Sequence, residues 1–137
     1  MPLRSRTPIA LIAILATGVA AGQVAESAPA AIDGVWKTAP RDDGSYVTVR
    51  IEPCMGDSGS RCGTVIDAHG GAKSDIIGDP ILDNMTFEGA NRWGGGEIIR
   101  PGRGTRYRSK LKLTAEGLEV SGCVAGGLFC GSTLWTR

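Results

Sequence analysis

The sequence predicts an all-β domain, a small antiparallel up-and-down barrel of about eight strands. After residue 33, turn-forming residues recur about every eight to fifteen positions, which is typical of strands joined by hairpins. No segment beyond residue 31 has a sustained helical apolar period, and most of the 21 glycines fall between the apolar runs. Closing the sheet into a barrel would remove its exposed edges, whereas an open sandwich of the same strands is the alternative.

Each expected strand is a short run that ends at proline, glycine or aspartate. The run 45–52 alternates clearly, so that Val47, Val49 and Ile51 share one face. The run 76–85 contains Asp79-Pro80 and fits either a bent strand or a short helical turn. The expected runs cover residues 34–38, 45–52, 61–67, 76–85, 95–99, 105–113, 118–124 and 130–136.

The N-terminus has the three parts of a cleavable secretory signal. Two arginines within the first six residues precede an apolar run over residues 9–21, and small residues end it. This run is too short to span a membrane, which takes about 20 apolar residues as helix. We therefore expect a periplasmic or secreted protein with no transmembrane segment in its mature chain. The expected parts are a signal peptide over residues 1–21, a flexible leader over 22–32 and the folded domain over 33–137.

All four cysteines lie in the expected folded domain. In a small exported domain an even number of cysteines predicts disulfides, and the spacing favours the two local pairs. Each would close a short loop and stabilise the fold by roughly 2.5 kcal/mol. A zinc site is the alternative, but its cysteines usually stand about two to four residues apart. The expected pairs are Cys54–Cys62 and Cys123–Cys130.

A series of short motifs resembles the exported bacterial proteins grouped as domain of unknown function 2147 (DUF2147). The likeness covers residues 33–137, and the order and spacing of the motifs carry it. Between residues 68 and 92 the chain departs from the family, which usually has an Asn-Pro and an arginine-rich segment there. The motifs are Gly34-Val35-Trp36-Lys37-Thr38, Cys62-Gly63-Thr64-Val65, Ile77-Gly78, Trp93-Gly94-Gly95-Gly96-Glu97-Ile98 with Pro101, Tyr107, Leu118-Glu119-Val120-Ser121-Gly122-Cys123 and Trp135-Thr136-Arg137.

The resemblance implies a lipocalin-like (calycin-like) barrel. Such barrels carry Gly-x-Trp at the start of the first strand, with a basic residue from near the last strand over the indole. Trp36 and Arg137 fit these two places and form the expected barrel-closing pair. Their cation–π contact would contribute about 0.5–2 kcal/mol.

A barrel of this kind suggests a protein that holds a small apolar ligand in the periplasm or extracellular space. The same inward faces can instead fill the interior, which would favour an interaction module, such as a hydrolase inhibitor or an envelope-stress accessory. Such a module would bind an envelope protein through its loops. The expected ligand-binding residues are Val47, Val49, Ile51, Tyr107, Leu111, Leu118 and Val120.

No group of residues in the sequence has the pattern of a catalytic or metal site. His69 is the only histidine, so it lacks the partners that a general base or a metal ligand needs. Asp75, Asp79 and Asp83 are evenly spaced but lack the closing glutamate of an EF-hand loop. We therefore expect neither an enzyme nor a bound metal or cofactor.

The strongest local charge feature is a row of basic residues between positions 100 and 112. It alternates with apolar residues, which favours the solvated outer face of a strand over a surface for an anionic partner or the cell envelope. A formal net charge of +1 and an aromatic content of 5% argue against nucleic-acid binding. The row comprises Arg100, Arg103, Arg106, Arg108, Lys110 and Lys112.

Overall fold

A computed structural model of the chain describes residues 2–3, 10, 12–13, 28–124 and 129–137. The expected signal peptide over 1–21 and residues 22–27 of the expected leader fall almost wholly outside these ranges. Among the described residues, eight antiparallel strands lie side by side in chain order. They are β1 Gly34–Lys37, β2 Tyr46–Cys54, β3 Asp57–His69, β4 Pro80–Gly89, β5 Arg92–Ile99, β6 Arg106–Leu113, β7 Leu118–Val124 and β8 Phe129–Trp135.

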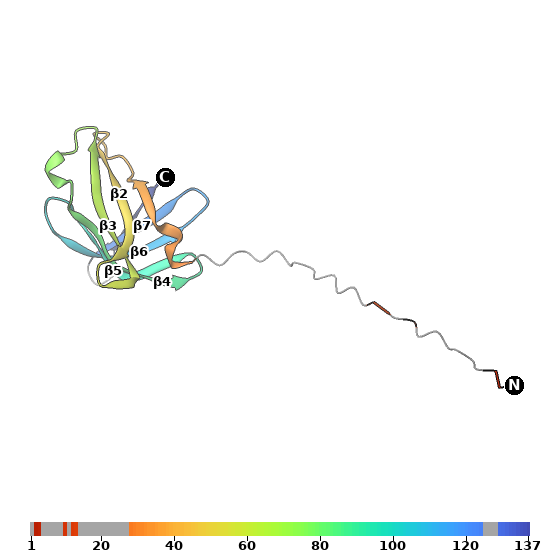
Figure 1. The fold of residues 1–137 in the computed structure, drawn as a ribbon. Coiled ribbons are helices and arrows are strands. Elements are labelled where there is room, and N and C mark those ends of the chain that lie inside the picture. The colour runs from red at the N-terminus through yellow and green to blue at the C-terminus, as the bar shows by residue number, and fades with distance from the viewer. Residues whose placement is uncertain (1, 4–9, 11, 14–27, 125–128) are drawn as a thin grey trace.

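The sheet curls into a nearly closed barrel (Figure 1). Its first and last strands meet through Lys37 and Thr136, whose backbone N–H groups each donate to the other's carbonyl oxygen at 2.6 and 2.9 Å. Every other neighbouring pair is consecutive in the chain and forms an antiparallel ladder. The fold class predicted from the turn spacing is therefore confirmed.

The hairpin of β2 and β3 is longer than the sequence suggests. Pro53 and the glycine-rich residues 56–60 were expected to end the second strand, yet β2 runs to Cys54 and β3 begins at Asp57. The ladder shifts register between Pro53 and Cys54. Proline is tolerated in a strand at such an irregularity because it has no N–H to donate.

The predicted disulfide between Cys54 and Cys62 is confirmed, with the two Cα atoms 4.9 Å apart. It joins β2 to β3 near the tip of their hairpin. The second predicted disulfide has its backbone in place, because Cys123 and Cys130 are direct partners in the β7–β8 ladder. The side chain of Cys130 lies outside the described residues, so this second pair stays a prediction.

Replacing both Cys54 and Cys62 with alanine is expected to lower the free energy of unfolding by about 2.5 kcal/mol, because the cross-link restricts the unfolded chain over a short loop. Urea denaturation of the oxidised proteins would measure the difference. As a control, adding reductant should destabilise the wild type more than the double variant. Equal stability of the wild type and the variant would contradict the prediction.

The run 76–85 contains both of the conformations that the sequence leaves open. Residues Ser74–Ile76 form a 3-10 turn, η2, and β4 starts at Pro80. β4 and β5 then form a tight hairpin whose two turn residues, Ala90 and Asn91, have φ values of 50° and 61°. Two successive positive φ angles match the twist of the flanking strands, as in a type I′ turn. This pairing extends β5 back to Arg92, before the expected start at residue 95.

Ala90→Gly is expected to stabilise the protein by about 0.5–1 kcal/mol, because alanine is strained at positive φ and glycine is not. Thermal denaturation would measure the change. Ala115→Gly is the matched control, since Ala115 also lies in an exposed hairpin turn but has no positive φ. That control should leave stability unchanged or slightly lower it. A destabilised Ala90→Gly variant would overturn this interpretation of the turn.

The N-terminal boundary of the folded part also differs from the expectation. Residues Pro29–Ile32, expected to belong to a flexible leader, form a 3-10 turn, η1, against one end of the barrel. Ile32 is fully buried, and the indole N–H of Trp93 donates to the Pro29 carbonyl oxygen at 3.2 Å. The turn is ordered because buried indole N–H groups need acceptors, which its carbonyls supply.

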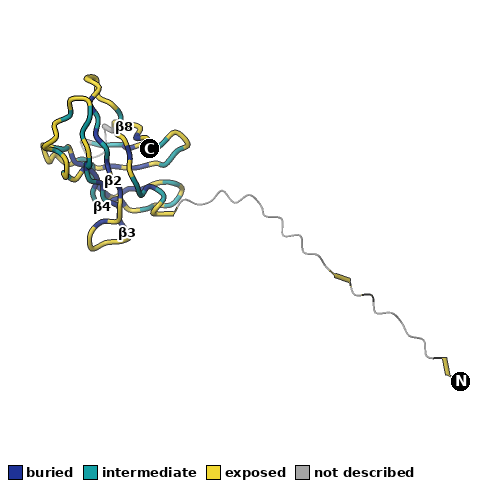
Figure 2. Tube along the Cα trace, turned by 45° about the horizontal axis from the view of Figure 1, so that its top comes forward, coloured by how far each residue is buried: buried dark blue, intermediate teal, exposed yellow. Residues whose placement is uncertain are grey.

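The core lies inside the barrel, where the inward side chains of the strands meet. Figure 2 shows buried residues along the strands and exposed ones in the loops. In the described part of the chain, no helix has the length and apolar character to cross a membrane. The core residues are Ile32, Trp36, Val47, Val49, Ile51, Val65, Ile81, Leu82, Met85, Trp93, Leu111, Leu118, Val120 and Trp135.

Candidate functional site

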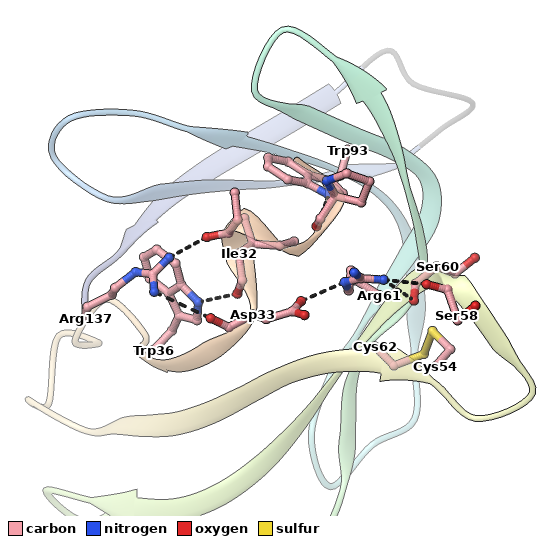
Figure 3. A network of polar contacts seen from close by, with 12 residues as sticks. Ile32, Asp33, Trp36, Cys54, Ser58, Ser60, Arg61, Cys62, Trp93 and Arg137 are labelled. Carbon is pink, nitrogen blue, oxygen red and sulfur yellow. Dashed lines mark hydrogen bonds and ion pairs between the residues drawn. A yellow bond between two sulfur atoms is a disulfide. The ribbon is translucent and has the colours of Figure 1, made fainter. Parts of the chain in front are cut away.

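One end of the barrel is closed by Trp36 and its neighbours (Figure 3). Trp36 is 1% exposed, and its indole N–H donates to the Ile32 carbonyl oxygen at 2.9 Å. The guanidinium carbon of Arg137 lies 4.3 Å from the centroid of the indole. Arg137 also donates to the Ala31 carbonyl oxygen at 2.6 Å. The last residue of the chain thereby holds η1 over this end.

A buried ion pair extends this closed end toward β3. The Nε of Arg61 donates to Oδ1 of Asp33 at 2.7 Å, and the Arg61 side chain is only 7% exposed. Its Nη1 donates to the carbonyl oxygens of Ser58 and Ser60 at 2.8 and 3.3 Å. These contacts tie the start of β1 to the β2–β3 hairpin (Figure 3). These contacts support a structural role for this end of the barrel.

The other end of the barrel opens into a cavity of about 1030 Å³. Its walls include the connections between β1 and β2, β3 and β4, and β5 and β6. Its volume lies just above the usual range for small-molecule sites, about 300–1000 Å³. The larger apolar side chains in its lining are Val47, Ile76, Ile81, Ile98, Ile99, Tyr107 and Trp135.

Two of the predicted ligand-binding residues line this cavity, one of them (Val47) from the edge of the core, and the others lie within the core. Val47 and Tyr107 line the cavity. The other predicted residues are at most 2% exposed and belong to the packed core: Val49, Ile51, Leu111, Leu118 and Val120. Strand alternation identifies an inward side chain but not its depth along the barrel.

Several cavity residues were not among the predicted ligand-binding residues. Ile76, Ile98 and Ile99 belong to short apolar runs. Such runs predict that the side chains are buried, but not that they line a cavity. Trp135 lines the cavity, although in the sequence it was noted only within a motif that resembles the DUF2147 family. No local signal marks these residues, since the cavity arises from loops that the fold brings together.

Charged side chains surround the apolar walls of the cavity. The lining includes four basic residues, Arg41, Lys73, Arg100 and Arg103, and the carboxylates of Asp42, Asp43 and Asp75. Hydrogen bonds from the side chain and the backbone of Ser45 hold the pKa of Asp43 below its usual value. Asp43 therefore stays ionised within its turn under mildly acidic conditions.

The single histidine lies at the end of β3. Its Nε2 is 2.8 Å from the Thr48 Oγ1 and 3.6 Å from a carboxylate oxygen of Asp67. The imidazole stacks on the Tyr46 ring with the centroids 4.6 Å apart. Both polar neighbours approach the same ring nitrogen, which differs from a catalytic triad, where the carboxylate orients the opposite nitrogen.

Two of the three evenly spaced aspartates, Asp79 and Asp83, have separate structural contacts, and the third, Asp75, lies in the lining of the cavity. Asp79 accepts a hydrogen bond from the Gly102 N–H at 2.9 Å, and Asp83 pairs with Arg106 at 3.0 Å. Among the described residues, Cys54, Cys62 and Asp83 are the group whose potential metal-binding atoms lie within 4.8 Å of one another. The two sulfur atoms of that group form the disulfide, so they are not free to bind a metal.

Comparisons with known proteins agree on family and fold. A family model described as "Uncharacterized protein conserved in bacteria (DUF2147)" matches residues 34–137. Among solved structures, the chain is similar to protein HP1028 from the human pathogen Helicobacter pylori, which is described as belonging to the lipocalin family. The two are 16% identical with a TM-score of 0.61, over 77% of this chain and 81% of that chain. This similarity shows a lipocalin-like fold. No curated protein matches the chain.

Proposed function

This chain belongs to the DUF2147 family of bacterial proteins, and we propose that it is a lipocalin-like binding protein that holds a small ligand with an apolar body. The observation that carries the proposal is the cavity of about 1030 Å³ in the open end of the barrel. The other end is closed by the contacts of Trp36 and Arg137.

The distribution of burial favours a binding site over a completely filled barrel. The deeper half of the interior is packed with side chains, whereas Ile76, Ile98 and Tyr107 in the cavity wall are only partly buried. A ligand that covers them gains about 25 cal/mol for each Å² of apolar surface removed from water. An interaction module with a filled interior would need no such cavity.

We place this binding role outside the cytoplasm and without catalysis. The Cys54–Cys62 disulfide supports an oxidising compartment, as does the signal-like N-terminus. A carrier needs one concave apolar site with few polar groups, and the cavity described above fits that need.

The proposal can be tested with two neighbouring isoleucines. Ile76 lines the cavity, whereas Ile77 is 46% exposed and is not part of the lining. The purified protein, with its disulfide intact, would be titrated with N-phenyl-1-naphthylamine, an uncharged apolar dye that fluoresces in dry surroundings. Ile76→Trp should weaken dye binding by about tenfold, because the indole occupies ligand space, and Ile77→Trp should not.

Native mass spectrometry of the purified protein gives a second measurement, since a carried ligand would appear as additional mass. The absence of both dye binding and any additional mass would overturn the proposal. Equal loss of dye binding in both tryptophan variants would also count against the cavity as the binding site.

A further inference from the structure

The mouth of the cavity has a set of basic side chains that the fold itself does not use. We call Arg41, Lys73, Arg100 and Arg103 the cationic rim, since all four line the cavity and are exposed. Among the described residues, none of the four makes a side-chain hydrogen bond or ion pair. Besides the Ser45 hydrogen bonds, the Arg41 charge already helps to lower the pKa of Asp43. The charges most available to a ligand are therefore those of Lys73, Arg100 and Arg103.

From this arrangement we propose that the ligand is an amphiphile with an anionic head group. The head would bind the cationic rim while the alkyl or aryl body enters the apolar cavity. This inference rests on the proposed binding function and specifies the chemistry of the ligand. A carboxylate and a phosphate share the required charge, so the chemistry is an anionic oxygen group on an apolar body.

Hydrogen-bonded backbone turns fix the two arginines between β5 and β6. The Arg100 N–H donates to the Thr105 carbonyl oxygen at 2.8 Å, and the Arg103 N–H donates to the Arg100 carbonyl oxygen at 3.1 Å. Asp79 accepts from the Gly102 N–H between them. The backbone that carries both guanidinium groups is thus ordered before any ligand arrives, which lowers the entropy lost on binding.

The other two members of the rim also lie on turns. The Arg41 N–H donates to the Ser45 carbonyl oxygen at 2.9 Å, and the Arg41 carbonyl oxygen accepts from Gly44 at 2.8 Å. Lys73 immediately precedes η2 and forms its N-terminal cap residue. The rim therefore draws one basic residue from each of two loops and two from a third, all facing one cavity.

The acidic residues in the lining do not fully neutralise the positive charge of the cationic rim. The cavity has four basic residues against Asp42, Asp43 and Asp75, so one positive charge remains. This holds even though Asp43, besides its Ser45 hydrogen bonds, is close enough to Arg41 for that charge to lower its pKa. A cleft with apolar walls concentrates the field of the remaining charge and favours an anion there.

Three of the four remaining residues of the basic row have acidic neighbours, and the fourth, Lys110, lies opposite Ser121. Arg106 contacts carboxylate oxygens of Asp83 at 3.0 Å and Glu97 at 3.7 Å. Arg108 is opposite Glu97 in the β5–β6 ladder, and Lys112 is opposite Glu119 in the β6–β7 ladder. The predicted solvated outer face thus describes β6 itself, whereas Arg100 and Arg103 belong to the cavity.

The test compares dodecanoate with dodecanol, which share an alkyl chain and differ in charge. Each would be titrated as a competitor of N-phenyl-1-naphthylamine against the wild type and two double variants. Arg100→Gln with Arg103→Gln should weaken dodecanoate binding by about tenfold and leave dodecanol unchanged. Arg108→Gln with Lys112→Gln removes the same charge from the outer face and should change neither ligand by more than about twofold. Added salt should weaken only dodecanoate.

The outcomes separate this inference from the proposed function. One outcome is that dodecanol and the dye bind, dodecanoate binds no better than dodecanol, and the rim variants do not change its binding. In that case the cavity binds apolar ligands, and the inference of an anionic head group is wrong. If none of them binds, the proposed function itself fails. Tighter binding of lysophosphatidylglycerol than of dodecanoate would identify a phospholipid-type head, and the reverse order a free carboxylate. Either order supports the inference only if the Arg100→Gln and Arg103→Gln double variant weakens the binding of the preferred anionic ligand.

Discussion

Asp33→Ala is expected to lower the free energy of unfolding by about 3 kcal/mol, because it leaves the buried Arg61 guanidinium without its carboxylate. The Arg61 side chain is 7% exposed and cannot recover water, whereas the Asp33 side chain is 30% exposed. The carbonyl oxygens of Ser58 and Ser60 still accept hydrogen bonds from Arg61, which reduces the loss of stability, but they do not neutralise its charge. The same substitution removes the side-chain contact between the residue that precedes β1 and the β2–β3 hairpin.

Arg61→Met provides the comparison that isolates the charge. Methionine fills much of the same volume without a charge, and it leaves only the half-buried Asp33 carboxylate unpaired. We expect Arg61→Met to be milder than Asp33→Ala, and the double variant to be more stable than Asp33→Ala alone. Urea denaturation would measure all three, with Asp42→Ala as a control for an exposed aspartate. If Asp33→Ala had the same free energy of unfolding as Asp42→Ala, the ion pair between Asp33 and Arg61 would not contribute to stability.

Much of the barrel follows from local sequence signals. The alternation of Val47, Val49 and Ile51 predicts which face of β2 is inward, and all three are at most 8% exposed. Short spacing predicts the Cys54–Cys62 disulfide. These signals are readable because a strand's side chains alternate with a period of two and because short loops favour local pairs.

What the sequence does not predict depends on contacts between distant segments. Nothing local marks Arg61 as a buried arginine, since its partner Asp33 lies 28 residues earlier. The order in η1 likewise depends on Trp93, whose N–H reaches Pro29 across 64 residues. A run such as Ala28–Ala31 has no periodicity of its own, so it was expected to be flexible.

The site is the least predictable part for the same reason. Alternation assigns both Leu111 and Tyr107 to the interior of β6, but only the latter reaches the cavity. Depth depends on the tilt of the strands and on how far the loops extend beyond them. Two members of the cationic rim, Arg100 and Arg103, were part of a longer basic row in the sequence, and only the turn between Arg100 and Thr105 separates them from β6.

The largest expected loss of stability comes from Trp36→Ala, which should lower the free energy of unfolding by about 3–5 kcal/mol. The indole is 1% exposed, so its removal leaves a cavity at the closed end. The substitution also removes the donor to the Ile32 carbonyl oxygen and the ring beneath Arg137. Denaturation at low temperature would keep enough folded protein for the measurement.

A double-mutant cycle with Arg137→Ala tests whether the two residues act together. Arg137→Ala alone should destabilise the protein by about 1–2 kcal/mol, since it loses the cation–π contact and its donation to the Ala31 carbonyl oxygen. Because Trp36→Ala already removes the ring, the double variant should lose at least about 0.5 kcal/mol less than the sum of the two. Neither residue lines the cavity, so Arg137→Ala should bind N-phenyl-1-naphthylamine as the wild type does. Strict additivity would mean that Arg137 closes the barrel through its backbone contacts alone, and loss of dye binding would mean that the two ends of the barrel are coupled.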